Sequence, residues 1–170
     1  MTARLPRAST LVAPLLAATI LAGCGGSGGG KPAQRVTGPG FSFAAPGGWQ
    51  VARSGNRVSA GSGSDLVQVA TFRLLRPYSA PLFAKVAKEL DVRMAGVAKQ
   101  TSGTLAGSSV VKAGGVRSHS YRVATDDRVD EYTFVLQGMH EYQLLCRRSA
   151  SHDDKNCRLL LSSFKIGKGT

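Results

Sequence analysis

The sequence predicts an α+β fold in which an antiparallel sheet is flanked by helices and preceded by a signal peptide and a flexible tether. Three observations lead to this prediction. The front of the 170-residue chain is apolar and then rich in glycine, unlike the rest. Several later segments alternate apolar and polar residues with a period of two, which is typical of strands. Two further segments show the 3.6-residue spacing of amphipathic helices.

Residues 1–23 have the pattern of a secretory signal peptide. Arg4 and Arg7 give a positive start, and an apolar run follows over residues 10–22. This run is shorter than the roughly 20 residues that a membrane-spanning helix needs. A positive start, a short apolar run and small residues together indicate a segment that is removed after export.

The end of this segment, Leu21-Ala22-Gly23-Cys24, resembles the lipobox of bacterial lipoproteins. The resemblance implies cleavage between Gly23 and Cys24 and attachment of lipid, such as palmitate, to the Cys24 thiol. The alternative is an ordinary secreted protein in which the cysteine occurs by chance. Since one acyl chain binds a membrane only marginally, firm anchoring needs two or more. We expect an exported protein that is lipid-anchored on the extracytoplasmic face of the cell membrane.

Residues 24–35 are expected to form a flexible tether because glycine and serine dominate their composition. They do not form a phosphate-binding loop, since no strand precedes them and no Lys-Ser/Thr ending follows. Residues 36–170 then form the predicted globular domain.

The first half of this domain is expected to hold strands followed by a long helix. The stretch "FSFAAPGGWQVA" predicts a strand, a turn and a second strand, with Trp49 in the core, and "NRVSAG" predicts a short third strand. Residues 65–75 are apolar on both alternating faces, which indicates a central strand covered on both sides. Residues 80–99 show one apolar helical stripe, with Pro81 suited to the first turn.

The second half is expected to form an antiparallel meander and a short helix. Turn-like connections of a few residues separate the strands, which favours antiparallel pairing. The helix is expected over residues 153–164, where Ser151 and Asp154 give a weak capping-box signal. The expected strands cover residues 109–112, 116–124, 128–136 and 141–147.

Two of the three cysteines fall on apolar faces of these elements. Cys157 shares the helical stripe with Leu160, and Cys146 shares a strand face with Leu144. If the helix packs on that face, the thiols are neighbours, and in an exported protein they are expected to oxidise to a disulfide. The alternative is two buried thiols that face the core separately. Pairing of these two leaves Cys24 for the lipid.

The order of elements, with "FSFAAPGGWQV" near the start and "EYTFVLQGMHEYQLLC" and "CRLLLSSFKI" near the end, resembles the PsbP/Mog1-like fold. Within that class it is similar to the lipoproteins of actinobacteria. The resemblance implies an α/β/α layered domain with non-enzymatic binding or assembly roles. Since the matching residues are mostly apolar, the resemblance implies no catalytic residue.

Candidate chemistry is sparse. His119, His140 and His152 lack metal-ligand spacing, and no CxxC pair occurs. His119 lies between two serines, but neighbouring strand residues point to opposite faces, so these do not form a triad. The acidic cluster "DDRVDE" lacks the alternating oxygens and glycine of a calcium loop. We therefore expect no catalytic site, no metal and no cofactor.

The chain is strongly basic, with a formal net charge of +12. Its basic residues are scattered rather than clustered, which argues against nucleic-acid binding. Arg117, His119 and Arg122 form a candidate ligand surface on one expected strand. The candidate partners are anionic lipid, an envelope polymer or a membrane protein.

These observations favour a membrane-anchored lipoprotein that acts as a non-enzymatic binding or assembly module at the cell envelope. One alternative is an envelope enzyme, such as a hydrolase with an unrecognised site in which His119 or His140 meets a carboxylate and a nucleophile. Another is a ligand-sensing ectodomain, although the sequence shows no attached kinase or membrane-spanning segment.

Overall fold

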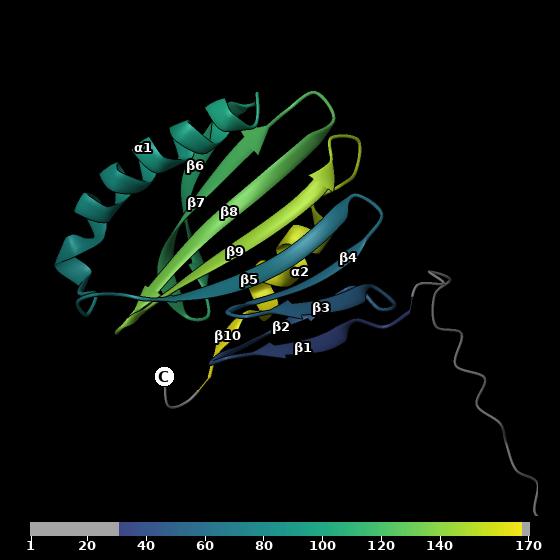
Figure 1. Cartoon of the computed structure of the whole chain (residues 1–170), viewed down its shortest axis with the longest axis horizontal. Coiled ribbons are helices and arrows are strands. Elements are labelled where there is room, and N and C mark those ends of the chain that lie inside the picture. Colours follow the sequence, from purple (N-terminus) through teal and green to yellow (C-terminus); the bar gives the residue numbers. More distant parts are fainter. Residues whose placement is uncertain (1–30, 168–170) are drawn as a thin grey trace, which may run out of the picture.

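The computed structural model describes residues 31–167 (Figure 1). The predicted signal peptide, its cleavage site, Cys24 and most of the tether lie outside the described residues. In chain order the elements are β1 (Gln34–Gly38), β2 (Phe41–Ala45), β3 (Gln50–Ser54), β4 (Arg57–Ser62), β5 (Asp65–Arg73), the 3-10 turn η1 (Ala80–Leu82), α1 (Phe83–Gln100), β6 (Thr104–Ala113), β7 (Val116–Ala124), β8 (Arg128–Gln137), β9 (His140–Ser149), α2 (Lys155–Ser163) and β10 (Lys165–Ile166).

The strands form two antiparallel sheets. The larger sheet has seven strands in the order β3-β4-β5-β9-β8-β7-β6, and the smaller has the order β1-β2-β10. Strands β6 to β9 pair in succession, which confirms the predicted meander. Strand β5 joins this meander to β4 by pairing with β9. The predicted α+β fold with an antiparallel sheet flanked by helices is confirmed.

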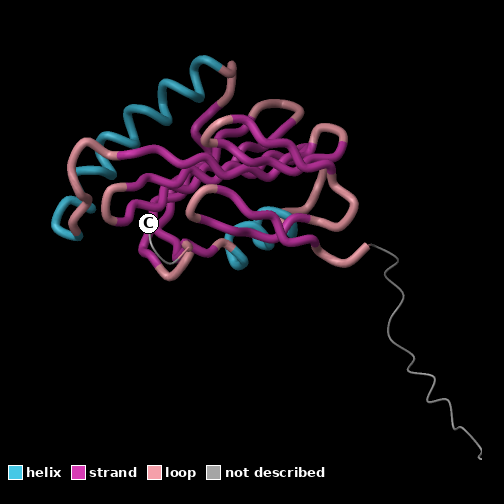
Figure 2. The backbone as a smooth tube through the Cα atoms, turned by 60° about the horizontal axis from the view of Figure 1, so that its bottom comes forward, coloured by secondary structure: helices cyan, strands magenta, loops and turns pink. Residues whose placement is uncertain are grey.

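The two helices lie on opposite faces of the seven-stranded sheet. Figure 2 shows α1 on one side of the sheet and α2 on the other, with the small sheet beside α2. Helix α1 contacts β6 and β7, whereas α2 contacts β2, β5, β6 and β9. The layers therefore follow the α/β/α order expected from the sequence.

A separate hydrophobic core fills each interface. The core on the α2 side joins both sheets to the helix, and the core on the α1 side is smaller because α1 covers only part of its face. The α2-side core includes Val36, Phe41, Phe43, Val58, Val67, Val69, Val135, Tyr142, Leu144, Leu160 and Phe164. The α1-side core includes Leu90, Met94, Ala98, Tyr121, Val123 and Phe134.

The apolar stripe predicted over residues 80–99 forms helix α1. Pro81 lies in the 3-10 turn that precedes it, where its missing N–H costs no helical hydrogen bond. Leu90, Met94 and Ala98 recur every four residues and are the buried side chains of the helix. The N–H of Gly103 donates to the carbonyl of Ala98 at 2.8 Å and ends the helix.

Strand β5 is covered fully on only one of its faces. Val67 and Val69 are completely buried against the α2-side core, but Phe72 on the opposite face is 38% exposed. The expected burial on both faces is therefore wrong for that end of the strand. The physical reason is the placement of α1 over β6 and β7, which leaves the α1-side face of β5 without a helix above it.

Several local features differ from the sequence-based expectations. Strands β1 and β10 were not predicted, and β6 begins at Thr104 rather than at the expected residue 109. The capping box at the start of α2 is wrong, because the Ser151 hydroxyl lies against that of Ser149. The first N–H of α2, on Lys155, is instead satisfied by Asp153, whose Oδ1 accepts it at 3.2 Å. Trp49 packs against the core but is only partly buried.

Neither helix in the described part of the chain, residues 31–167, combines the length and the hydrophobicity that a membrane span requires. The described chain begins at one end of the long axis of the molecule, and the loop between β5 and α1 lies at the other end (Figures 1 and 2).

Candidate functional site

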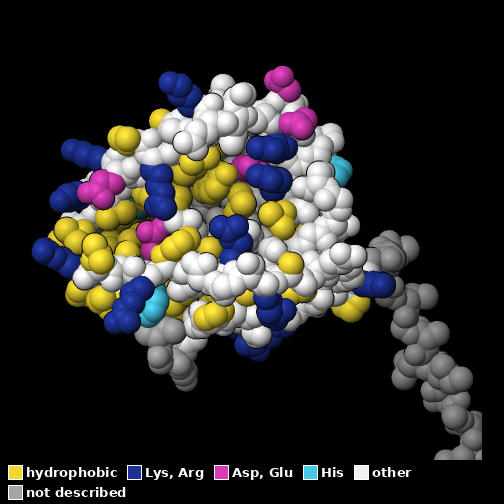
Figure 3. Space-filling model, in the orientation of Figure 1, with side chains coloured by type: hydrophobic (Ala, Val, Ile, Leu, Met, Phe, Trp, Pro, Cys, Tyr) yellow, Lys and Arg dark blue, Asp and Glu magenta, His cyan; other side chains and the backbone are white. Residues whose placement is uncertain are grey.

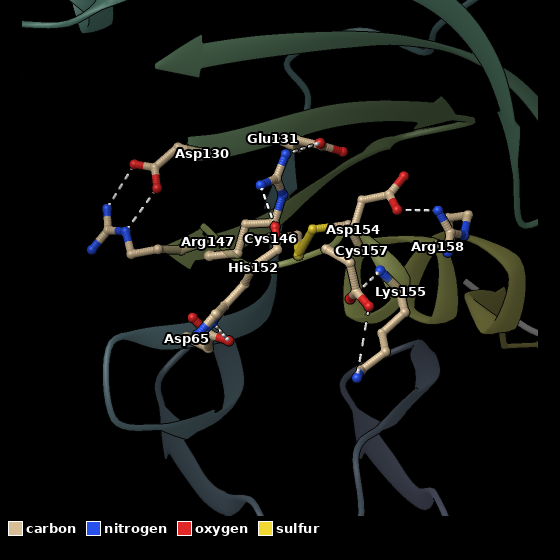
Figure 4. The surroundings of a disulfide bond; sticks show 12 residues. Asp65, Asp130, Glu131, Cys146, Arg147, His152, Asp154, Lys155, Cys157 and Arg158 are labelled. Atoms are coloured by element: carbon tan, nitrogen blue, oxygen red, sulfur yellow. Dashed lines mark hydrogen bonds and ion pairs between the residues drawn. A yellow bond between two sulfur atoms is a disulfide. The ribbon is translucent and has the colours of Figure 1, made fainter. Parts of the chain in front are cut away.

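A disulfide joins Cys146 of β9 to Cys157 of α2, with 5.3 Å between their Cα atoms. Figure 4 shows it together with the ion pairs around it. Both residues are buried, and Cys146 lies on the α2-side face of the sheet with Leu144. The predicted disulfide is confirmed, and the alternative of two separate buried thiols is wrong.

The sheet separates the residues of the predicted ligand surface. Arg117 and His119 lie on the α1 side of β7, whereas Arg122 lies on the α2 side, because successive strand residues alternate between faces. The Arg122 guanidinium pairs with Glu131 of β8 at 3.2 Å. These three residues therefore do not form one continuous surface.

The Phe83 ring lies between Arg117 and His119. The His119 ring stacks on it with centroids 3.8 Å apart, and the Arg117 guanidinium carbon lies 4.1 Å from its centroid. The Nε2 atom of His119, which is buried, hydrogen-bonds the Phe83 carbonyl at 3.1 Å. These contacts fasten the start of α1 to β7, which is a structural role for His119.

A polar cleft lies on the other side of the sheet, between β6, β7 and α2. Its volume is about 320 Å³, and serine side chains, Arg122, Glu131 and Leu161 contribute to its walls. Besides Arg122, the Arg148 guanidinium lies 4.0 Å from Glu131, and the Thr133 hydroxyl donates to that of Ser120 at 3.0 Å. Charges of both signs beside hydroxyl groups suit a polar ligand.

Asp130 is held by Arg147 on the α1 side. The Arg147 Nε and Nη2 atoms donate to the two carboxylate oxygens at 2.8 Å each, and the Asp130 side chain is only 3% exposed. The hydrogen bond to Asp130 raises the pKa of Arg147 above its ordinary value. Burial, and secondarily the charge of Asp130, raises the pKa of Tyr132. The arrangement stabilises the charged pair within the sheet.

A second carboxylate contact, between Asp65 and His152, was not predicted from the sequence. The Nδ1 atom of His152 lies 2.9 Å from Asp65 Oδ2, and the Ser149 N–H donates to Asp65 Oδ1 at 3.1 Å. The pair borders a hollow of about 460 Å³ that Trp49 also lines. A carboxylate that orients an imidazole is one part of an acid–base site. Ser151 also lines this hollow, but its hydroxyl is hydrogen-bonded to the Ser149 hydroxyl, 3.0 Å away.

His140, the remaining one of the three histidines, lies near an aromatic ring. Its ring centroid is 6.1 Å from that of Tyr142. Among residues 31–167, no group of three or more His, Cys, Asp or Glu side chains is arranged to hold a metal ion.

An apolar groove lies between α1 and the uncovered part of the sheet. Its volume is about 360 Å³, and an ion pair of 3.2 Å between Arg93 and Glu141 lies along it. Figure 3 shows hydrophobic side chains gathered in this hollow, with Lys and Arg side chains around it. The apolar part of its lining comes from Leu74, Pro77, Leu82, Val86, Leu90 and Leu136.

Comparisons with known proteins bear on the fold. Neither a scan against protein-family models nor a search of curated proteins finds a match. Among solved structures, cyanobacterial PsbP (CyanoP) from Synechocystis sp. PCC 6803 is similar, with a TM-score of 0.55 and 17% identity over 84% of this chain and 98% of that one.

A protein from Bacteroides thetaiotaomicron VPI-5482 is also similar, with a TM-score of 0.59 and 13% identity over 80% of this chain. The present chain spans 49% of the length of that protein. At these identities the likeness concerns the fold alone. Together with the layered topology, it shows that this chain has a PsbP-like fold.

Proposed function

We propose that this chain is an exported lipoprotein, anchored through acylated Cys24, whose PsbP-like domain is a non-enzymatic binding or assembly module. It works at the outer face of the cytoplasmic membrane, within the cell envelope. Its similarity to the lipoproteins of actinobacteria, noted from the sequence, is part of this proposal. The partners are anionic lipid, an envelope polymer or a membrane protein.

The pairing of cysteines is the observation that best supports the anchor. The chain contains three cysteines, and the disulfide uses Cys146 and Cys157. Cys24, which remains, stands at the end of the lipobox-like motif. Structural disulfides are typical of compartments outside the reducing cytosol, which agrees with export.

The shape of the domain supports a binding role. The polar cleft beside Glu131 and the apolar groove beside α1 lie on opposite faces of the sheet. Each has a volume within the range of small-ligand sites. The composition predicts a tether of about ten residues with a reach on the order of 15–20 Å, which suffices to hold the domain off the membrane surface and let it reorient.

Metabolic labelling with an alkyne analogue of palmitate tests the anchor. The full chain is expressed in a bacterium with a lipoprotein-processing pathway, alongside Cys24→Ser and the double variant Cys146→Ser/Cys157→Ser. We expect label and membrane fractionation in the wild type and the double variant, and loss of both in Cys24→Ser. Label that persists in Cys24→Ser, or its absence from the wild type, would contradict the proposal.

A pull-down from membranes with the acylated chain tests the binding role. Bound protein, lipid and glycan are identified and compared with those recovered by Glu131→Gln, which alters the polar cleft. Specific recovery by the wild type supports a binding or assembly module. Recovery identical to that of a resin without protein counts against it.

The Asp65–His152 pair favours one second candidate, an envelope hydrolase. A fluorophosphonate probe, which labels activated serines, distinguishes the two functions. Labelling of the wild type that is lost in His152→Gln would support the hydrolase, whereas no labelling agrees with the non-enzymatic module.

A further inference from the structure

The loop between β5 and α1 exposes apolar side chains at one end of the molecule. Leu75 at its tip has a relative exposure of 101%, as large as that of an isolated residue. Leu82 at the start of the helix is 40% exposed, and Phe72 at the end of the strand is 38% exposed. Apolar residues grouped in this way on a soluble domain usually mark a contact surface.

The protrusion of Leu75 is held in place by the backbone. The N–H of Leu74 donates to the Met139 carbonyl at 2.7 Å, and the N–H of Tyr78 donates to the Gly138 carbonyl at 2.8 Å. The loop is thus fixed on both sides of Leu75 to the turn between β8 and β9. The exposure of this leucine is therefore a property of a fixed loop and not of a frayed end.

The charge around the loop is mainly positive. Arg73 and Arg76 flank Leu74 and Leu75 in the sequence. Within residues 31–167 neither arginine forms an ion pair. Arg117 also lies at this end, because its guanidinium carbon is 4.1 Å from the ring centroid of Phe83, the first residue of α1. Glu89 on the groove wall is an acidic side chain that opposes this charge.

We infer that this loop is a second membrane contact, in which Leu75 enters the interface of an anionic bilayer while Arg73 and Arg76 meet lipid phosphates. A single leucine that projects between two arginines suits a fluid surface that closes around it. Long basic side chains can keep their stems along apolar surface and their charged ends at the headgroups. The neighbouring groove offers further apolar surface, lined by Leu82 and Val86, to the same interface.

The position of the loop determines how this contact would orient the domain on the membrane. It lies at the end of the long axis opposite to the start of the described chain (Figures 1 and 2). A lipid on Cys24 and an inserted Leu75 therefore place the domain along the membrane rather than upright on its tether. Two weak attachments on one molecule bind far more tightly than either alone.

Vesicle co-sedimentation tests the inference with a chain of residues 24–170 that carries Cys24→Ser, so that no lipid contributes. This chain keeps all the described strands and helices, which lie between Gln34 and Ile166. We expect it to bind vesicles that contain phosphatidylglycerol, to bind phosphatidylcholine vesicles much less, and to dissociate as ionic strength rises. The inference rests on the proposed export, but this measurement does not depend on Cys24.

The variants separate the apolar contribution from the charge. Leu75→Asp is expected to weaken binding about tenfold or more, because it removes the aliphatic side chain that enters the bilayer interface. Arg73→Gln/Arg76→Gln is expected to weaken binding about 30-fold, since each basic residue near an anionic surface contributes about fivefold. The controls Val92→Asp, at a position 76% exposed on α1, and Lys99→Gln, in the last turn of α1, are expected to stay within about twofold.

Fluorescence locates the contact independently. Tryptophan at position 75, introduced as Leu75→Trp, is expected to shift to the blue on anionic vesicles, whereas Val92→Trp is not. Circular dichroism of every variant confirms folding. A wild type that does not bind at low salt, or Leu75→Asp that binds as well as Val92→Asp, overturns the inference. The membrane pull-down is then repeated with Leu75→Asp. A protein that the wild type recovers and Leu75→Asp does not would identify the loop as a protein contact instead. Acylation of Cys24 would stand in each case.

Discussion

Asp130 of β8 and Arg147 of β9 are directly opposite in the antiparallel register and share two hydrogen bonds of 2.8 Å. The carboxylate is almost completely buried, while the arginine is about one third exposed. Cross-strand pairs of opposite charge stabilise a sheet, but removal of one partner from a buried pair leaves the other charge without compensation.

Asp130→Asn is therefore expected to lower the free energy of unfolding by about 2–3 kcal/mol. Fully buried pairs lose about 3–5 kcal/mol, and the partial exposure of Arg147 reduces the loss. Urea denaturation measures it. The control is Asp126→Asn, at an exposed position in the turn two residues before β8 begins. It is expected to change the free energy of unfolding by less than about 0.5 kcal/mol. Equal effects of the two substitutions would show that the buried pair is not stabilising.

The disulfide gives a second prediction. Cys146 and Cys157 are separated by 11 residues, and a loop of this size corresponds to about 3 kcal/mol in the chain-entropy description. Cys146→Ala/Cys157→Ala is expected to lose about that much stability in urea, whereas Cys24→Ser is expected to lose almost none. A double variant as stable as the wild type would mean that packing of α2 on β9, without the covalent link, holds the helix.

Side-chain periodicity was sufficient to predict most of the fold. The range expected from alternation for β7, residues 116–124, is the range found. The apolar stripe over residues 80–99 likewise predicted α1. The separate stripe of α2, which holds Cys157, together with strand parity predicted that Cys157 and Cys146 are neighbours. Strands β1 and β10 were missed because they have few buried residues of their own. Pairing with β2 forms them, and that pairing depends on the rest of the fold.

The polar contacts were beyond sequence reasoning because chain folding, not spacing, brings their members together. Asp65 and His152 are 87 residues apart. The separation of Arg117 and His119 from Arg122 was open to prediction, since residues of opposite parity on a strand face opposite sides. The burial of His119 was not, because it depends on where α1 crosses the sheet.

The Phe83 ring is expected to fasten the start of α1. Phe83→Ala removes the surface on which His119 stacks and over which Arg117 lies. A loss of about 2–3 kcal/mol in unfolding free energy is expected, less than for a fully buried phenylalanine. Hydrogen exchange should become faster in the first turns of α1 but not near Met94. Val92→Ala is the control on the exposed side of the same helix, and exchange that matches this control would contradict the role of Phe83.

Tyr121 is expected to make the fold sensitive to alkali. Burial first, and then its 2.9 Å hydrogen bond to Asp91 and the charge of that carboxylate, raise the pKa of Tyr121 well above 10.0. The stability from the neutral phenol is complete below the unfolded pKa and is lost as pH rises above about 10, because the unfolded chain ionises first. The loss approaches about 1.4 kcal/mol per pH unit for one proton.

Urea denaturation between about pH 9 and 11 measures how steeply the unfolding free energy falls with pH. It is done in a Cys24→Ser background, which prevents disulfide exchange. We expect a smaller slope for Tyr121→Phe than for this background, and an intermediate slope for Asp91→Asn. Equal slopes would mean that Tyr121 ionises alike in both states.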